Sequence, residues 1–231
     1  TDEAGVKAAA NKLRAGGVDA DGHRCDVARE DECTTIIAQI IEQRGGIDVL
    51  VNNAGITQRS AFVDTAAGVY RKVMDVNFFG SLYCTKATID SLVERKGMIV
   101  VIESLAGVAP LLGRTGYCAS KHALHGLFTT LRSELKTTGV HIMLVCPGFV
   151  ETNLQTRALG GDGQVTAHPQ SVVGKPTSAA RVAADIYAGA LKRKRLLVIT
   201  PVGKLSYWIN RLAPRLYELI MVRQVREELE R

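Results

Sequence analysis

Ile47-Asp48-Val49-Leu50-Val51-Asn52-Asn53-Ala54-Gly55 is the stretch that decides the fold. Its first five residues form an apolar run, which is typical of a strand that helices cover on both faces. Its last four residues are small or carry amides, so the backbone there can approach a flat ligand and bind it by hydrogen bonds. A plain strand-to-loop turn would account for the same four residues, and this stretch alone leaves both interpretations open.

Strands and helices alternate on both sides of this stretch. The sequence predicts further strands over residues 22–27, 98–102, 140–145 and 196–200. It predicts helices over residues 4–15, 31–44, 66–94, 117–137 and 178–191, and a long loop over 153–176. This alternation indicates an α/β fold with a parallel sheet, in which ligands bind beyond the carboxyl ends of the strands.

Composition excludes several classes of protein. The chain has 231 residues, of which 46% are hydrophobic and 23% charged, as in ordinary globular domains. No run of about 18 apolar residues predicts a membrane-spanning helix. The five cysteines (Cys25, Cys33, Cys84, Cys118 and Cys146) form no C-x-x-C pair, so we expect no metal site and reduced thiols in a cytoplasmic protein.

The net charge of +6 lies at one end of the chain. Residues 192–231 hold ten Lys or Arg and four Asp or Glu, whereas residues 1–191 hold nineteen of each kind. A neutral body argues against a nucleic-acid partner, which would need a broad basic surface. We therefore expect two parts, a domain over 1–200 and a basic tail over 201–231.

Polar side chains follow the predicted strands. Ser104 comes directly after the strand over 98–102, and Tyr117 follows thirteen residues later. Lys121 lies four residues after Tyr117, so the two share one helix face. A neighbouring ammonium favours ionisation of a phenol, which suits Tyr117 for proton transfer. Local capping by Ser104 and a structural Tyr/Lys pair are the alternatives that each feature allows on its own.

Two further signals lie elsewhere in the chain. Asn77 stands within a helical segment, where Asn is slightly unfavourable, and is either a buried amide or a hydrogen-bonding group in a site. Pro147-Gly148 follows the strand over 140–145 and leads through Val150 to Thr152. Pro and Gly also mark ordinary turns.

Taken together, these residues resemble the short-chain dehydrogenase/reductase family over about residues 1–200. The Asn-Asn-Ala-Gly motif stands at 52–55, and the Asn, Ser, Tyr and Lys of the family's active site match Asn77, Ser104, Tyr117 and Lys121. The segment 121–152 and a Leu-Ala-Pro in the tail are similar to the member-seven branch of dehydrogenase/reductases. The resemblance implies a Rossmann-like, doubly wound parallel sheet.

The resemblance also implies the chemistry. An oxidoreductase of this family transfers a hydride between NADP or NAD and a small-molecule carbonyl or alcohol. Tyr117 would be the acid/base, Lys121 would lower its pKa and hold the nicotinamide ribose, Ser104 would bind the substrate oxygen, and Asn77 would position a water. The expected cofactor contacts are Asp26, Val27, Asn53, Ala54, Gly55, Tyr117, Lys121, Pro147, Gly148, Val150 and Thr152.

The sequence departs from the family pattern in two places. Glu103 stands where the family often has Ser. The chain also lacks the family's first strand, Gly-rich turn, first helix and second strand, so we expect a truncated chain in which the strand at 47–51 is an exposed edge. A non-catalytic remnant that acts as an interaction protein is the alternative function.

The tail over 201–231 carries apolar residues at intervals of three and four, interrupted by Pro214. Pro214 predicts two short helices. Two interpretations stay open: packing against the protein's own body or a second subunit of a homo-oligomer, and peripheral attachment to an anionic membrane surface.

Overall fold

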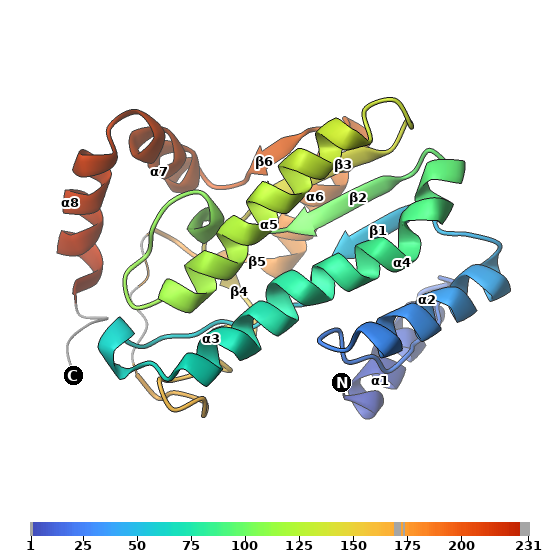
Figure 1. The fold of residues 1–231 in the computed structure, drawn as a ribbon, viewed down its shortest axis with the longest axis horizontal. Coiled ribbons are helices and arrows are strands. Elements are labelled where there is room, and N and C mark those ends of the chain that lie inside the picture. The colour runs from blue at the N-terminus through green and yellow to red at the C-terminus, as the bar shows by residue number, and fades with distance from the viewer. Residues whose placement is uncertain (1, 169–171, 173, 227–231) are drawn as a thin grey trace.

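The fold is an α/β structure built on a four-stranded parallel sheet (Figure 1). A computed structural model describes residues 2–168, 172 and 174–226. The strands β1 (Val49–Asn52), β2 (Met98–Ile102), β3 (His141–Cys146) and β6 (Leu196–Val198) lie in the order β1-β2-β3-β6, and every pair is parallel. The four apolar runs from residue 47 onward therefore form the strands that the sequence predicts.

Helices cover both faces of this sheet. On one face, α4 (Gly80–Glu94) and α5 (Thr115–Glu134) pack over a core that includes Leu92, Leu124, Phe128, Ile142 and Leu144. On the other face, α6 (Ala179–Leu191) packs over Val100, Met143 and Val145 (Figure 1). Burial on both faces explains why these strands are continuous apolar runs. The doubly wound architecture is confirmed.

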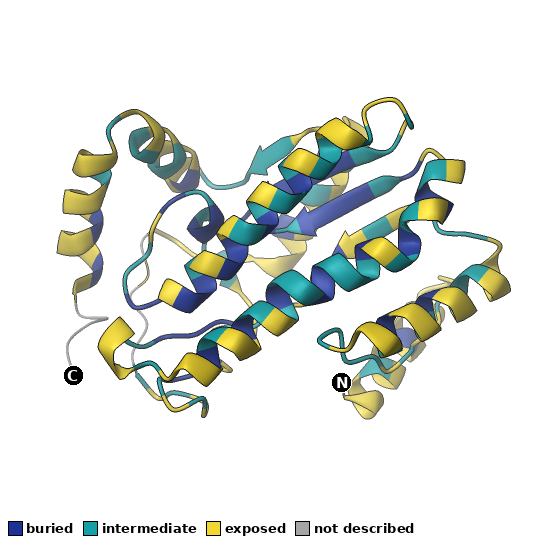
Figure 2. Cartoon of the chain, in the orientation of Figure 1, coloured by how far each residue is buried: buried dark blue, intermediate teal, exposed yellow. Residues whose placement is uncertain are grey.

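The β1 edge is exposed on one face, as the sequence predicts. Val49 and Val51 are each 52% exposed, and Figure 2 shows the contrast with the buried strands β2 and β3. Val51 pairs with Val100, so its side chain projects from the face that α6 covers further along the sheet. Among the described residues, no helix extends that cover to β1.

The predicted strand over residues 22–27 is wrong. Within the described residues, α1 (Glu3–Ala15) and α2 (Glu30–Arg44) are joined by irregular chain that contains no strand. Backbone groups of a strand need a neighbouring strand, and β1 pairs only with β2 in this part of the chain that the structure describes. The segment instead packs through Val27 against Gly80 of α4, and α2 lies along α4.

The segment predicted to be helical over 66–94 is one continuous helix that contains a π-helical turn. It consists of α3 (Ala67–Met74), a π-helical turn over Asp75–Phe79, and α4. Asn77 lies in the middle of that turn and is fully buried. Such turns insert one residue into a helix and re-aim the side chains around them.

The tail forms two helices that meet at Pro214, as predicted. These are α7 (Pro201–Leu212) and α8 (Pro214–Val225), while residues 227–231 of the expected tail lie outside the described residues. Asn210 donates to the backbone oxygen of Val108 (2.9 Å), and the Tyr217 hydroxyl donates to that of Pro110 (3.1 Å). One side of the tail thus packs on the protein's own body.

The segment predicted as a long loop is largely irregular in its described part. Its two ends pair as a short parallel ladder between β4 (Val150–Glu151) and β5 (Thr177–Ser178), which the sequence did not predict. Short 3-10 turns lie at Phe62–Asp64 and Leu105–Gly107. None of the helices in the described residues has the length and apolarity needed to cross a membrane.

Candidate active site

A cavity of about 890 Å³ lies beyond the carboxyl ends of β1, β2 and β3. Residues that follow each of these strands line it together with the first turns of α5. Nine of the residues singled out in the sequence lie on its wall: Asn53, Gly55, Ser104, Tyr117, Lys121, Pro147, Gly148, Val150 and Thr152. Sequence-distant segments therefore meet in one concave site, as parallel sheets generally arrange.

Ser104 and Tyr117 both line this cavity, and Ser104 acts on the pKa of the Tyr117 hydroxyl. Ser104 follows β2 and caps the short turn over Leu105–Gly107, because its hydroxyl accepts from the Ala106 backbone N–H at 3.1 Å. Burial raises the pKa of Tyr117 to about 12, and the Ser104 hydrogen bond and the Arg114 charge oppose that rise. A bound cation or a stronger donor would be needed to bring this phenol toward neutral pH.

Lys121 lies beside this phenol. Its side chain is buried, and its Nζ lies 5.7 Å from the centre of the Tyr117 ring. The ammonium donates to the backbone oxygen of Ile102 (2.9 Å), the last residue of β2. Burial lowers the pKa of Lys121 to about 8, and the charge of Glu103 opposes that fall.

Asn77 lies behind the cavity wall. Its Oδ1 accepts from the Ile56 backbone N–H (2.8 Å), and its Nδ2 donates to the Ile56 oxygen (3.0 Å) and to Ser120 Oγ (2.8 Å). Three hydrogen bonds occupy this amide. Asn77 thus connects the loop after β1 to α5. The water-positioning role expected for it stays a prediction.

Asp26, Val27 and Ala54 do not line the cavity. The Asp26 carboxylate accepts from the Ala28 N–H (3.2 Å) and its backbone N–H donates to Glu32 (2.9 Å), so it organises the turn before α2. Val27 is packed on Gly80. The structure does not bring these expected cofactor contacts to the cavity.

The backbone around the cavity fits a flat ring. A Cβ on Gly55 would lie 3.4 Å from Asn77 Oδ1 and 3.7 Å from Lys121 Nζ. A Cβ on Gly148 would lie 3.1 Å from Thr200 Oγ1. Only small residues leave this space open, so the residues present fit the nicotinamide end of a dinucleotide.

Sequence reasoning missed the far wall of the cavity. Residues of α7 and α8 complete it, including Ile209, Tyr217, Ile220, Met221 and Val225. Arg114, which is 2% exposed and precedes α5, also lines the cavity. The three-to-four spacing of apolar residues in the tail was the signal for this packing, although it does not say what the helices cover.

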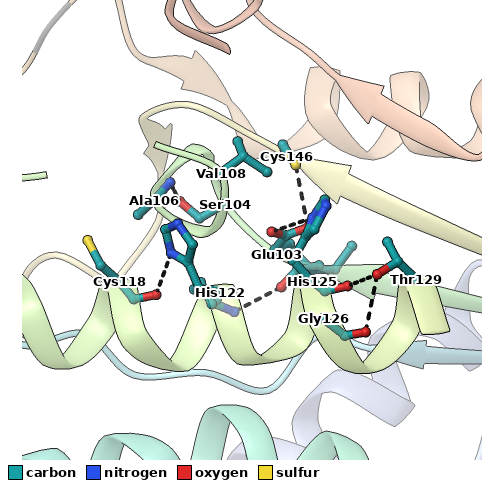
Figure 3. Close-up of polar contacts among 12 residues, drawn as sticks. Glu103, Ser104, Ala106, Val108, Cys118, His122, His125, Gly126, Thr129 and Cys146 are labelled. Carbon is teal, nitrogen blue, oxygen red and sulfur yellow. Dashed lines mark hydrogen bonds and ion pairs between the residues drawn. The ribbon is translucent and has the colours of Figure 1, made fainter. Parts of the chain in front are cut away.

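A second polar cluster was also missed. The Glu103 carboxylate, adjacent to Ser104, lies 3.2 Å from His125 Nδ1 through both oxygens and accepts from the Cys146 thiol at 3.6 Å (Figure 3). Glu103 is 2% exposed. His125 follows Lys121 by four residues and therefore shares its helix face, which was the available sequence signal.

The profile of the short chain dehydrogenase family matches residues 1–160. With a Ser, Tyr and Lys converging on a cavity at the end of a parallel sheet, the chain belongs to the short-chain dehydrogenase family.

Within the family, the chain is similar to dehydrogenase/reductase SDR family member 7B of Rattus norvegicus, with 38% identity over 205 residues. That match covers 88% of this chain and 63% of the rat protein, so the chain spans less than two thirds of the relative's length. The expected likeness to the member-seven branch is confirmed.

Two solved structures share the fold. A short-chain dehydrogenase from Streptomyces avermitilis is 27% identical with a TM-score of 0.78, and the match covers 94% of this chain and 84% of that one. A short-chain dehydrogenase/reductase from Burkholderia phymatum in complex with NAD is 22% identical with a TM-score of 0.81, covering 93% and 83%.

Proposed function

We propose that this chain carries the proton-transfer site of an oxidoreductase that moves a hydride between NADP or NAD and a carbonyl or alcohol. The observation that carries this proposal is the convergence of Ser104, Tyr117 and Lys121 on one large cavity. The fold accommodates NAD in the Burkholderia phymatum protein, which supports a nicotinamide cofactor here.

In the reductive direction, a bound nicotinamide dinucleotide supplies the hydride to the carbonyl carbon. Ser104 donates a hydrogen bond to the substrate oxygen and orients it beside Tyr117. Tyr117 gives its hydroxyl proton to that oxygen as the alcohol forms. Lys121 stabilises the phenolate that remains and binds the nicotinamide ribose. Oxidation of an alcohol reverses each proton movement.

The test removes one oxygen atom. The substitution Tyr117→Phe is made in the whole polypeptide. It should lower turnover by a factor on the order of 10²–10⁴ while the fold is retained. Turnover is followed by NADPH and NADH oxidation over a panel of carbonyl compounds. Tyr187→Phe is the matched control, because Tyr187 is 67% exposed on α6. Near-normal rates in Tyr117→Phe would overturn the proposed function.

A non-catalytic interaction protein is the second candidate. The exposed edge of β1 favours it, since an unpaired apolar edge can pair with a strand of another chain. Turnover by the wild-type protein that Tyr117→Phe abolishes would exclude this alternative.

We further propose that the tail contacts an anionic membrane surface without spanning it. Its outward side exposes Trp208 (55%), Leu212 (76%) and Leu219 (61%). Arg211, Arg215 and Arg223 are exposed on the same two helices. Apolar side chains flanked by cations suit the boundary of an anionic lipid surface.

Co-sedimentation with anionic and neutral liposomes tests the membrane proposal. Trp208→Ser with Leu212→Ser should reduce binding to anionic liposomes, whereas Tyr187→Ser with Leu191→Ser on α6 is the matched control. Equal binding of both double variants would contradict it. Alternatively, the same exposed side contacts a second subunit of a homo-oligomer. In that case Trp208→Ser with Leu212→Ser would lower the mass measured by sedimentation equilibrium.

A further inference from the structure

Glu103 is a buried charge next to the proposed site, and the mechanism does not use it. Its carboxylate fits beneath the turn over Leu105–Gly107, where a Cβ on Gly107 would overlap it. Its polar neighbours in the described structure are His125 Nδ1 at 3.2 Å and the Cys146 thiol at 3.6 Å (Figure 3). Burying a carboxylate costs free energy, so a buried carboxylate next to a site is a candidate for a functional role.

Lys121 lines the same cavity as Glu103. The Lys121 ammonium is anchored on the backbone oxygen of Ile102, the residue immediately before Glu103. Glu103 and Cys146 are the two groups whose charges favour the ammonium form of Lys121, and they oppose the effect of burial. The thiol of Cys146 has a raised pKa because it is buried next to Glu103, so it stays neutral and Glu103 is the effective counter-charge.

We propose that Glu103 is a positioning residue that keeps Lys121 charged in its buried place, and that His125 makes this effect depend on pH. The proposal rests on the proposed function for its catalytic consequence, although the electrostatic coupling itself does not.

His125 controls the net charge of the pair. Its hydrogen bond to Glu103 raises the pKa of His125, whereas burial and the charges of Arg132 on α5 and Arg211 on α7 lower it. Its side chain is 33% exposed, so it exchanges protons with solvent. Below the His125 pKa, the imidazolium neutralises Glu103; above it, the full negative charge of Glu103 acts on Lys121.

The coupling has a direction. As pH rises and His125 loses its proton, Glu103 supports the ammonium of Lys121 more strongly. Lys121 therefore stays charged to a higher pH than its burial alone would allow. In the reductive reaction, loss of the Lys121 charge ends the stabilisation of the Tyr117 phenolate, so this pair extends activity toward alkaline pH.

A titration of the whole polypeptide without cofactor tests the coupling. Lysine side chains labelled with ¹³C at Cε are followed by NMR against pH, and the Lys121 signal is the one absent in Lys121→Met. Glu103→Gln should lower the Lys121 midpoint by about one pH unit, because it removes an opposite charge. Glu134→Gln is the matched control, since Glu134 is exposed on the same helix. Glu103→Ser is the second variant if Glu103→Gln does not fold.

The outcomes separate the coupling from the proposed function. A Lys121 midpoint that stays unchanged in a folded Glu103 variant overturns the proposal. The ring signals of His125 should also titrate at lower pH in Glu103→Gln, and an unchanged His125 midpoint overturns the pH-dependent part. Where turnover is measurable, the alkaline limb of kcat moves to lower pH with Glu103→Gln. Wild-type protein without turnover would sink the proposed function and leave the titration to decide the coupling.

Discussion

Two regions of the sheet differ in how the chain is covered and paired. One is the flank around β2 and β3, and the other is the flank beyond β1. Around β2 and β3, helices cover both faces, and Tyr117 and Lys121 are held among buried groups. Beyond β1, residues 22–27 run without a strand partner in the described structure, and Asp26 is engaged in its own turn. The groups proposed for proton transfer therefore lie in a covered part of the fold, whereas residues 22–27, which include the expected cofactor contacts Asp26 and Val27, do not.

The largest expected difference between the two flanks lies in the binding of the two halves of the dinucleotide. We expect residues 1–231 to bind NADH and NADPH poorly, because the sequence has no Gly-rich turn leading into a helix N-terminus that would bind a diphosphate. Nicotinamide mononucleotide, which lacks the adenosine half, should bind nearly as well as NADH. Calorimetric titration measures both. Micromolar binding of NADH, far tighter than the mononucleotide, would contradict this expectation.

Asn77 joins the two flanks, and its removal should be the next largest effect. Asn77→Ala removes a fully buried amide and its two hydrogen bonds to the backbone of Ile56, and should lower the free energy of unfolding by about 3 kcal/mol. Urea denaturation followed by circular dichroism measures it. Asn210→Ala removes a single bond to Val108 and serves as the control. A loss no larger than the control's would mean that Asn77 does not hold the loop after β1.

The same substitution on two strands compares the flanks directly. Val145→Ala on β3 removes fully buried methyl groups and should cost about 2 kcal/mol of unfolding free energy. Val51→Ala on β1, where the side chain is 52% exposed, should stay within about 0.5 kcal/mol. Equal losses in the two denaturation curves would show that β1 is buried in solution by a partner.

His125 gives the smallest effect, and it depends on pH. The pKa of His125 is raised in the folded protein, so its pairing with Glu103 adds stability at pH values below the unfolded pKa. That stability is lost as pH rises through the folded pKa. His125→Gln should therefore cost no more than about 1 kcal/mol at low pH, given partial solvent screening, and less at high pH. Thermal melts across pH measure it, and a pH-independent loss would contradict it.

Much of the fold could be predicted because the strands are unambiguous. The apolar runs at 98–102 and 140–145 need no tertiary information to be recognised as strands. The segment at 22–27 is also predicted as a strand, yet it forms none, because pairing depends on its neighbours. Local pattern also gave no sign of the π-helical turn around Asn77.

The site divides in the same way. Spacing along one helix predicts that Tyr117 and Lys121 share a face, and the structure adds Ser104 to them. Spacing could not show that three hydrogen bonds join the Asn77 amide to Ile56 and Ser120. Nor could it show that the Glu103 carboxylate lies against His125, since that depends on the space left by Gly107.

The helices α7 and α8 form the far wall of the cavity, and this placement has a consequence for synthesis. A ribosome makes residues 201–225 after every other part of that wall, and chains fold progressively as they emerge. Before α7 and α8 are made, the cavity between the sheet and α5 of the nascent protein is therefore an open, water-filled basin. Chaperones that bind apolar surfaces meet this basin during that interval, and a pause in translation near residue 200 would lengthen the encounter.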